Sequence, residues 1–128
     1  MGTTKLFFLR DDELPHRHVF FFASWNGGAD EAEAITSRFL RLVVTLAKHH
    51  GSDVLRSDEP STPGIGRQFV AHGEVLAAAV ARLEIEYPDA IAKGRLKIHP
   101  DSIPEELRRT ARRKMAALHA ARARLQVV

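Results

Sequence analysis

The chain has 128 residues, of which 45% are hydrophobic and 27% charged, with a formal net charge of +3 and no cysteine. This composition is typical of a globular protein and not of a disordered one. The length suits a single domain, so we expect one α+β domain covering residues 1–128. The absence of cysteine excludes disulfides, cysteine-based zinc sites and cysteine nucleophiles.

The charge is unevenly distributed. Residues 1–60 carry seven basic and nine acidic side chains, a net −2, whereas residues 61–128 carry twelve and seven, a net +5. This asymmetry favours an anionic partner for the C-terminal half. The apolar run at residues 6–9 is too short for a signal peptide or a membrane span, so we expect a cytoplasmic protein that does not enter a membrane.

Residues 5–10 and 19–25 are aromatic-rich runs of strand length, separated by turn-forming residues at 11–15. They predict an antiparallel hairpin. Both runs are apolar on both faces, so the sheet needs cover on both sides. Either a third helix covers the second face, or that face binds a partner, which could be a second copy in a homodimer. We expect the interaction face to include Phe7, Phe20, Phe22 and Trp25.

Two helices are predicted in the middle of the chain. The first starts at the Asp30 cap and ends at Gly51, with an apolar stripe that includes Ile35, Phe39 and Val43. Residues 52–66 are expected to form a long loop. The second helix is predicted over 67–87 and is stopped by Pro88. Gly73 lies in its apolar stripe, which predicts close approach by another helix or by the sheet. Residues 95–99 are a short third strand or an extended connector.

The last segment, 102–126, predicts an amphipathic helix that begins at a capping box formed by Ser102 and Glu105. Its apolar stripe faces the core. That stripe contains Ile103, Leu107, Ala111, Met115, Leu118, Ala121 and Leu125. Lys114 also falls within the stripe, so its stem must pass the core edge or contact something there. The opposite face is basic, with Arg108, Arg109, Arg112, Arg113 and Arg124.

These five arginines are the first candidate binding site. Contact with phosphates would make binding weaken steeply as salt rises. An acidic protein surface is a second possible partner, and a solvated helix face with no partner is the alternative interpretation.

His16 and His18 are candidate metal ligands, because residues two apart on a strand point to the same side. Asp11, Asp12 or Glu13 could complete the site, although a hairpin tip also collects polar residues without a metal. His49 and His50 are expected to serve the end of a helix, and His72 to lie at the core edge.

Gly64, Gly66 and Arg67 lead into the second predicted helix, so their loop is a candidate phosphate site. The segment matches neither the P-loop nor the dinucleotide motif, and an ordinary loop is the alternative.

The sequence therefore predicts an α+β fold: an N-terminal antiparallel hairpin, with a possible third short strand, packed against three helices. It contains no nucleophile elbow and no suggestive carboxylate pair, which favours a non-catalytic protein without a cofactor over an enzyme. The leading hypothesis is a small non-catalytic binding protein that presents the basic C-terminal helix to nucleic acid, either DNA or RNA, or to a nucleic-acid-binding machine. The first alternative is a protein-interaction module, such as an inhibitor, adaptor or assembly factor, acting through the hairpin face. A further alternative is a metal- or phosphate-dependent enzyme that uses His16, His18 and the 61–67 loop.

Overall fold

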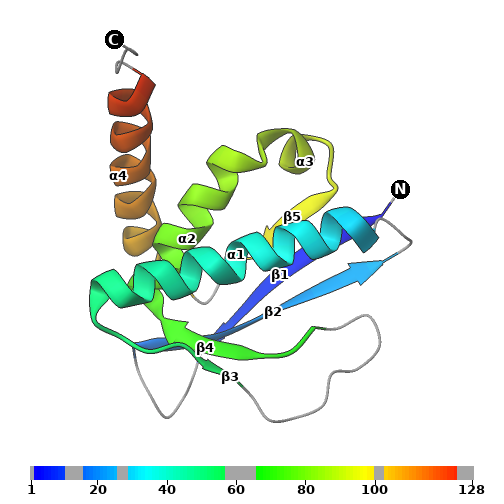
Figure 1. Cartoon of the computed structure of the whole chain (residues 1–128), viewed down its shortest axis with the longest axis horizontal. Coiled ribbons are helices and arrows are strands. Elements are labelled where there is room, and N and C mark those ends of the chain that lie inside the picture. Colours follow the sequence, from blue (N-terminus) through cyan, green and yellow to red (C-terminus); the bar gives the residue numbers. More distant parts are fainter. Residues whose placement is uncertain (1, 11–15, 26–28, 57–65, 100–102, 124–128) are drawn as a thin grey trace.

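The computed structural model describes residues 2–10, 16–25, 29–56, 66–99 and 103–123. Within these residues the fold is mixed α/β, with a five-stranded sheet and four helices (Figure 1). In chain order the elements are β1 (Thr3–Arg10), β2 (Arg17–Trp25), α1 (Ala29–His50), β3 (Leu55–Arg56), β4 (Phe69–His72), α2 (Gly73–Glu86), α3 (Pro88–Ala92), β5 (Leu96–His99) and α4 (Glu105–Ala123).

The predicted hairpin forms the centre of the sheet. The strand order is β3-β4-β2-β1-β5. Strands β1 and β2 are antiparallel, with Phe7 opposite Phe21 and Phe8 opposite Phe20. Strand β5 pairs parallel to β1, so residues 96–99 are the third strand that the sequence left open. The remaining two strands, β3 and β4, extend the sheet beyond β2 and were not expected.

The hydrophobic core lies between one face of this sheet and the helices α1 and α2. Side chains alternate between the two faces of a strand, and on β1 and β2 it is the even-numbered phenylalanines that are buried. The ring of Phe39, on α1, lies 6.2, 5.4 and 5.6 Å from the rings of Phe8, Phe20 and Phe22. Leu76, Val80 and Leu83 of α2 belong to the same core, so both helices cover the same face.

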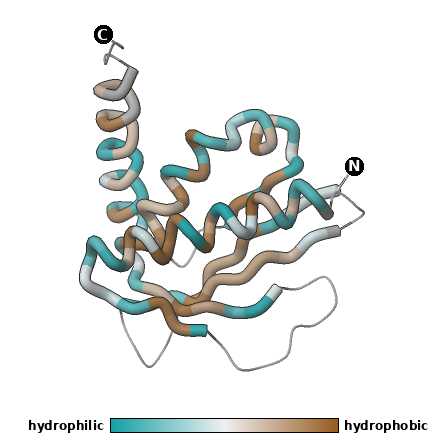
Figure 2. Tube along the Cα trace, viewed as in Figure 1, coloured by the Kyte–Doolittle hydropathy of each residue, from teal (hydrophilic) through white to brown (hydrophobic). Residues whose placement is uncertain are grey.

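The odd-numbered side chains of β1 and β2 point to the other face. Phe7 and Phe21 are only half-buried there, and Leu9 is 53% exposed. Because directly opposite residues on paired strands share a face, the register extends this surface across all five strands. Ala23 lies on this side as well but is only 3% exposed, and His72 lies at its margin, opposite Arg17. We call the more accessible part the open sheet face: Lys5, Phe7, Leu9, Arg17, Val19, Phe21, Leu55, Val70, Lys97 and His99. Figure 2 shows that β1 and β2 are apolar along much of their length, as strands with two apolar faces must be.

The predicted helix over 67–87 is wrong at its N-terminal end, because residues 69–72 form β4 instead. Phe69 and Val70 are strand-favouring residues, and pairing with β2 overrides the helical spacing that the sequence offers. The close approach expected at Gly73 is confirmed. A Cβ atom there would lie 3.0 Å from Nε2 of His18, on β2.

Three further expectations need correction. Residues 55–56 of the expected loop pair with β4 as β3, and residues 57–65 lie outside the described part. Pro88 ends α2 but also occupies the first turn of α3, where its missing N–H is tolerated, so the described chain has four helices and not three. Of the predicted apolar stripe, Ile103, just before α4, and Ala111 are buried, but Leu118 is 50% exposed. Figure 1 shows why: α4 starts beside α2 and then diverges from it, so its C-terminal half projects from the domain.

A charged cluster joins α1 to α2 beside the core. Arg38 donates two hydrogen bonds to the carboxylate of Glu86, at 2.6 and 2.8 Å, and Arg82 donates another at 2.8 Å. The hydrogen bond from Arg38 lowers the pKa of Glu86 to about 2 from its usual 4.5. Ionised Glu86 therefore stabilises the packing of the two helices.

The substitution Phe39→Ala should destabilise the fold by about 3–5 kcal/mol, since it removes a ring that is 0% exposed and contacts three other rings. Urea unfolding would measure the loss. As a control, Val44→Ala on the exposed side of α1 should change stability by well under about 1 kcal/mol.

Glu86 should make stability depend on acid pH. Because its folded pKa is depressed, its contribution is complete above pH 4.5 and is lost as pH falls towards 2. The shift corresponds to roughly 3 kcal/mol. Urea unfolding from pH 6 to pH 2 should show this loss in the wild type and a flatter profile in Glu86→Gln. An exposed carboxylate on α1 offers the control, Glu33→Gln, which should keep the wild-type profile. Identical profiles for wild type and Glu86→Gln would contradict the assignment.

Candidate functional site

The arginines of α4 are held mainly by partners within the chain. Arg108 donates to the backbone oxygen of Ile103 at 3.2 Å, and Arg109 pairs with Glu105 at 3.1 Å. Arg112 donates two hydrogen bonds of 3.2 Å to Glu84 of α2. Arg113 is exposed, and Arg124 lies outside the described residues. Arg112 thus joins α4 to α2, whereas the partners of Arg108 and Arg109 lie within or just before α4. Carboxylates lie beside Arg109 and Arg112, so the net positive charge of this face is smaller than the sequence suggests.

The interaction face predicted from the sequence is divided between two sides of the sheet. Phe20 and Phe22 are 1% and 7% exposed, so they belong to the core under α1. Phe7 lies on the open sheet face, where its ring is stacked against those of Phe21 at 5.3 Å and His99 at 4.9 Å. The side chain of Trp25 lies outside the described part. Phe21, and not Phe20 or Phe22, lies beside Phe7 on the open sheet face, because side chains alternate along the strand.

The predicted phosphate loop does not lead into a helix. Residues 69–72 form β4, so the segment after Arg67 is a strand and offers no helix N-terminus. The amide of Gly66 already donates to the carbonyl of Phe22 at 2.7 Å. Arg67 is exposed, and Gly64 lies outside the described residues. The geometry expected for phosphate binding is therefore missing from the described part of this segment.

The two histidines predicted as a metal pair have separate surroundings. His18 is 3% exposed, on the helix-covered face, and burial lowers its pKa. His16 is exposed, and its ring stacks on that of His72 at 5.8 Å. Asp11, Asp12 and Glu13 lie outside the described residues. The structure thus links His16 to a histidine from a distant part of the chain.

A different group of side chains, of types that can ligate a metal ion, comes together where α1 ends and α2 begins. His50 is the last residue of α1, His72 precedes α2, and Glu74 lies in the first turn of α2. One ligand atom from each lies within 4.8 Å of the others. The rings of His50 and His72 are 4.5 Å apart, and burial followed by the nearby His50 lowers the pKa of His72. We call His50, His72 and Glu74 the histidine corner.

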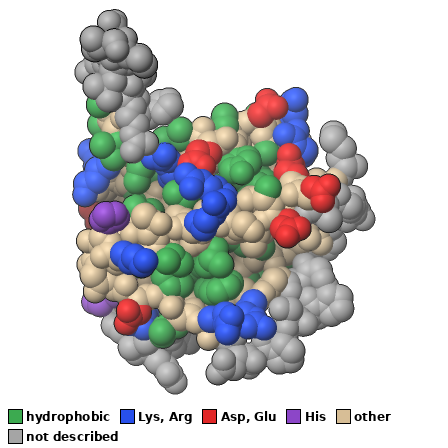
Figure 3. Space-filling view, viewed as in Figure 1, with side chains coloured by type: hydrophobic (Ala, Val, Ile, Leu, Met, Phe, Trp, Pro, Cys, Tyr) green, Lys and Arg blue, Asp and Glu red, His purple; other side chains and the backbone are tan. Residues whose placement is uncertain are grey.

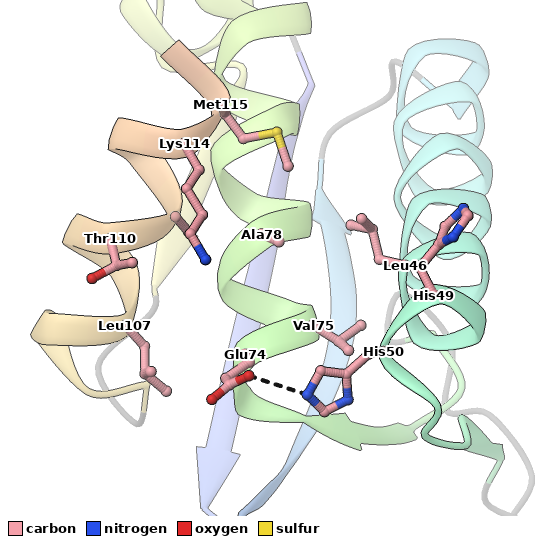
Figure 4. A pocket seen from close by; sticks show the side chains of 11 residues that line it. Leu46, His49, His50, Glu74, Val75, Ala78, Leu107, Thr110, Lys114 and Met115 are labelled. Carbon is pink, nitrogen blue, oxygen red and sulfur yellow. Dashed lines mark hydrogen bonds and ion pairs between the residues drawn. The ribbon is translucent and has the colours of Figure 1, made fainter. Parts of the chain in front are cut away.

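A pocket of about 360 Å³ adjoins this corner, between α1, α2 and α4 (Figure 4). Leu46, Val75 and Met115 contribute apolar side chains to its lining, and His50, Glu74 and Lys114 contribute polar ones. Figure 4 shows the amine of Lys114 turned towards α2, which explains a lysine in the apolar stripe of α4.

Sequence reasoning missed the histidine corner. His50 and Glu74 are separated by 24 residues, and the spacing of His72 and Glu74 becomes meaningful only when a helix is known to start between them. Because residues 52–66 were predicted to be a loop and residues 67–87 a helix, the sequence did not indicate that β4 ends beside the last turn of α1.

The comparisons with known proteins return nothing: no family model matches the sequence, and neither a curated protein nor a solved structure matches the chain. Among the described helices, none is long and apolar enough to cross a membrane. Any function must therefore be argued from the chain's own surfaces.

Proposed function

We propose that this protein is a non-catalytic interaction module that binds another protein through its open sheet face. The observation that supports this most strongly is the half-buried pair Phe7 and Phe21, which lies opposite the face covered by α1 and α2. Leu9 and Leu55, 53% and 45% exposed, extend the apolar surface along the sheet. A contiguous apolar surface of this kind on a small domain is typical of a binding site.

The charge around this surface favours an acidic partner. The five described strands contain five lysines and arginines and no aspartate or glutamate. Of these five cations, Lys5, Arg17 and Lys97 belong to the open sheet face itself. Figure 3 views the molecule from the side shown in Figure 1, where acidic and basic side chains are mixed. A partner with an apolar centre and carboxylates around it would complement the open sheet face.

A second copy of the chain fits this surface less well. In a two-fold dimer through the same face, each copy would contribute only cations from its strands. Arg17 or Lys97 of one copy would then meet cations of the other, and like charges at an interface oppose association. We therefore assign the surface to a different protein.

The ring arrangement also disfavours nucleic acid at this face. Phe7 and His99 are nearly parallel, with an interplanar angle of 8°, and Phe7 and Phe21 are at 24°. Rings that stack on their neighbours along the sheet have part of their faces covered by those neighbours. A base needs an open ring face on which to stack, whereas a protein side chain can pack against ring edges.

The test is affinity purification from the protein's own cells with the wild type and with Phe21→Arg. A specific protein with an acidic surface should bind the wild type. Phe21→Arg should weaken binding of the purified partner by about 2 kcal/mol or more, roughly 30-fold in Kd. Calorimetry with that partner would measure the loss, and binding should weaken as salt rises.

The control is Val44→Arg, which places the same charge at an exposed apolar position on α1 and should leave binding unchanged. Both variants are checked for folding by thermal unfolding. Retention of the partner by Phe21→Arg would overturn the proposal. A concentration-dependent dimer abolished by Phe21→Arg would assign the face to self-association instead.

Nucleic-acid binding through α4 stays a competing prediction. It requires a gel shift with duplex DNA or RNA that weakens steeply with salt, by about 0.9 in log K per log salt for each phosphate contact. The shift must also be lost when Arg109 and Arg113 become glutamate, a change that leaves the Arg112 bridge to Glu84 in place. Because three described arginines already have partners within the chain, we expect no such shift at physiological salt.

A further inference from the structure

We propose that the histidine corner is a binding site for a divalent transition metal of the zinc class. The site is distinct from the proposed interaction face, because it lies where α1 ends and α2 begins and two of its ligands, His50 and Glu74, belong to those helices. Only His72 borders the open sheet face, at the end of β4 opposite Arg17. Two imidazoles and a carboxylate are a ligand set that zinc prefers and magnesium does not.

The backbone holds the three ligand residues in place. Residues of α1 and α2 share one hydrophobic core, and the hydrogen bonds between Arg38 and Glu86 join the same two helices. His50, His72 and Glu74 therefore project from the ends of elements whose relative position is fixed. Only side-chain rotations are needed to bring their ligand atoms together.

The distances suit a shared ion. Zinc bonds of about 2.0–2.1 Å in tetrahedral geometry place neighbouring ligand atoms about 3.3 Å apart. Nε2 of His50 and a carboxylate oxygen of Glu74 share a hydrogen bond of 3.1 Å, which an ion bound to both atoms would replace. The ligand atom of His72 completes a group whose members are all within 4.8 Å. In the metal-bound form, rotation of the His72 side chain would close the remaining gap.

His50 also has the outer contact that a metal-binding histidine needs. Its Nδ1 lies 2.9 Å from the hydroxyl of Ser52. With a proton on Nδ1 donated to this oxygen, the lone pair of Nε2 faces Glu74 and is available to a metal. Such second contacts fix the tautomer of a ligating histidine.

Metal binding would compete with the cap of α2. Nδ1 of His72 accepts a hydrogen bond from the amide of Glu74 at 3.2 Å, and this bond caps the helix. A neutral ring that accepts at Nδ1 carries its proton on Nε2, so neither nitrogen is free while the cap is intact. Binding therefore exchanges the cap for a metal bond. Three protein ligands leave a fourth position for water.

The experiment is titration of the full chain, freed of any histidine tag, with zinc chloride and separately with magnesium chloride in a calorimeter at neutral pH. We expect one zinc ion per chain and no magnesium binding. His50→Gln and Glu74→Gln should each bind zinc at least about tenfold more weakly. His72→Asn should do the same while its side-chain oxygen still caps α2, so this variant separates metal binding from folding.

The matched control is His49→Gln, which removes the neighbouring exposed histidine of α1 and should bind zinc like the wild type. Circular dichroism establishes that each variant is folded, and the folded variants decide the result. The proposal is overturned if the wild type binds no zinc, if His72→Asn binds it undiminished, or if His49→Gln weakens binding as much as His50→Gln does.

Discussion

The structure depends on the burial of one face of the central hairpin under Phe39. This ring is enclosed by Phe8, Phe20 and Phe22, and it fixes α1 across the sheet. Once α1 is fixed, α2 can bury its own apolar residues only beside it, in the same core. The bonds from Arg38 and Arg82 to Glu86 then join the two helices at the edge of that core. The positions of β4, β5 and α4 follow from where α2 begins and ends.

Placing both helices on one side leaves the other side of an equally aromatic sheet without helical cover in the described part of the chain. Phe7 and Phe21 stack on each other there, with their ring centroids 5.3 Å apart. The surrounding strands supply cations and no carboxylate. Apolar surface provides the main free energy of an association, and the charge around it selects the partner. These features together support our proposal of an acidic protein partner.

The same packing creates the histidine corner. Strand β4 returns to the sheet beside β2 and ends next to the last turn of α1, so His72 meets His50. The start of α2 then adds Glu74. The arginines of α4 have a different outcome, because Glu84 and Glu105 are close enough to bind Arg112 and Arg109. Two of the arginines on α4 thus form ion pairs within the chain, whereas two histidines that share no sequence motif become neighbours.

Several features could be predicted from the sequence because their causes are local. Apolar spacing located α1 and most of α4, aromatic runs located the hairpin, and Gly73 marked a close contact with His18. The uniformly apolar strands of the hairpin also indicated that both of its faces need cover. Only the tertiary structure decided that residues 69–72 form a strand, which phenylalanines lie inward, and which arginines have partners. These outcomes depend on contacts between residues far apart in the chain. A one-residue change of strand register exchanges the two faces, and local spacing carries no information about which partner a folded neighbour will supply.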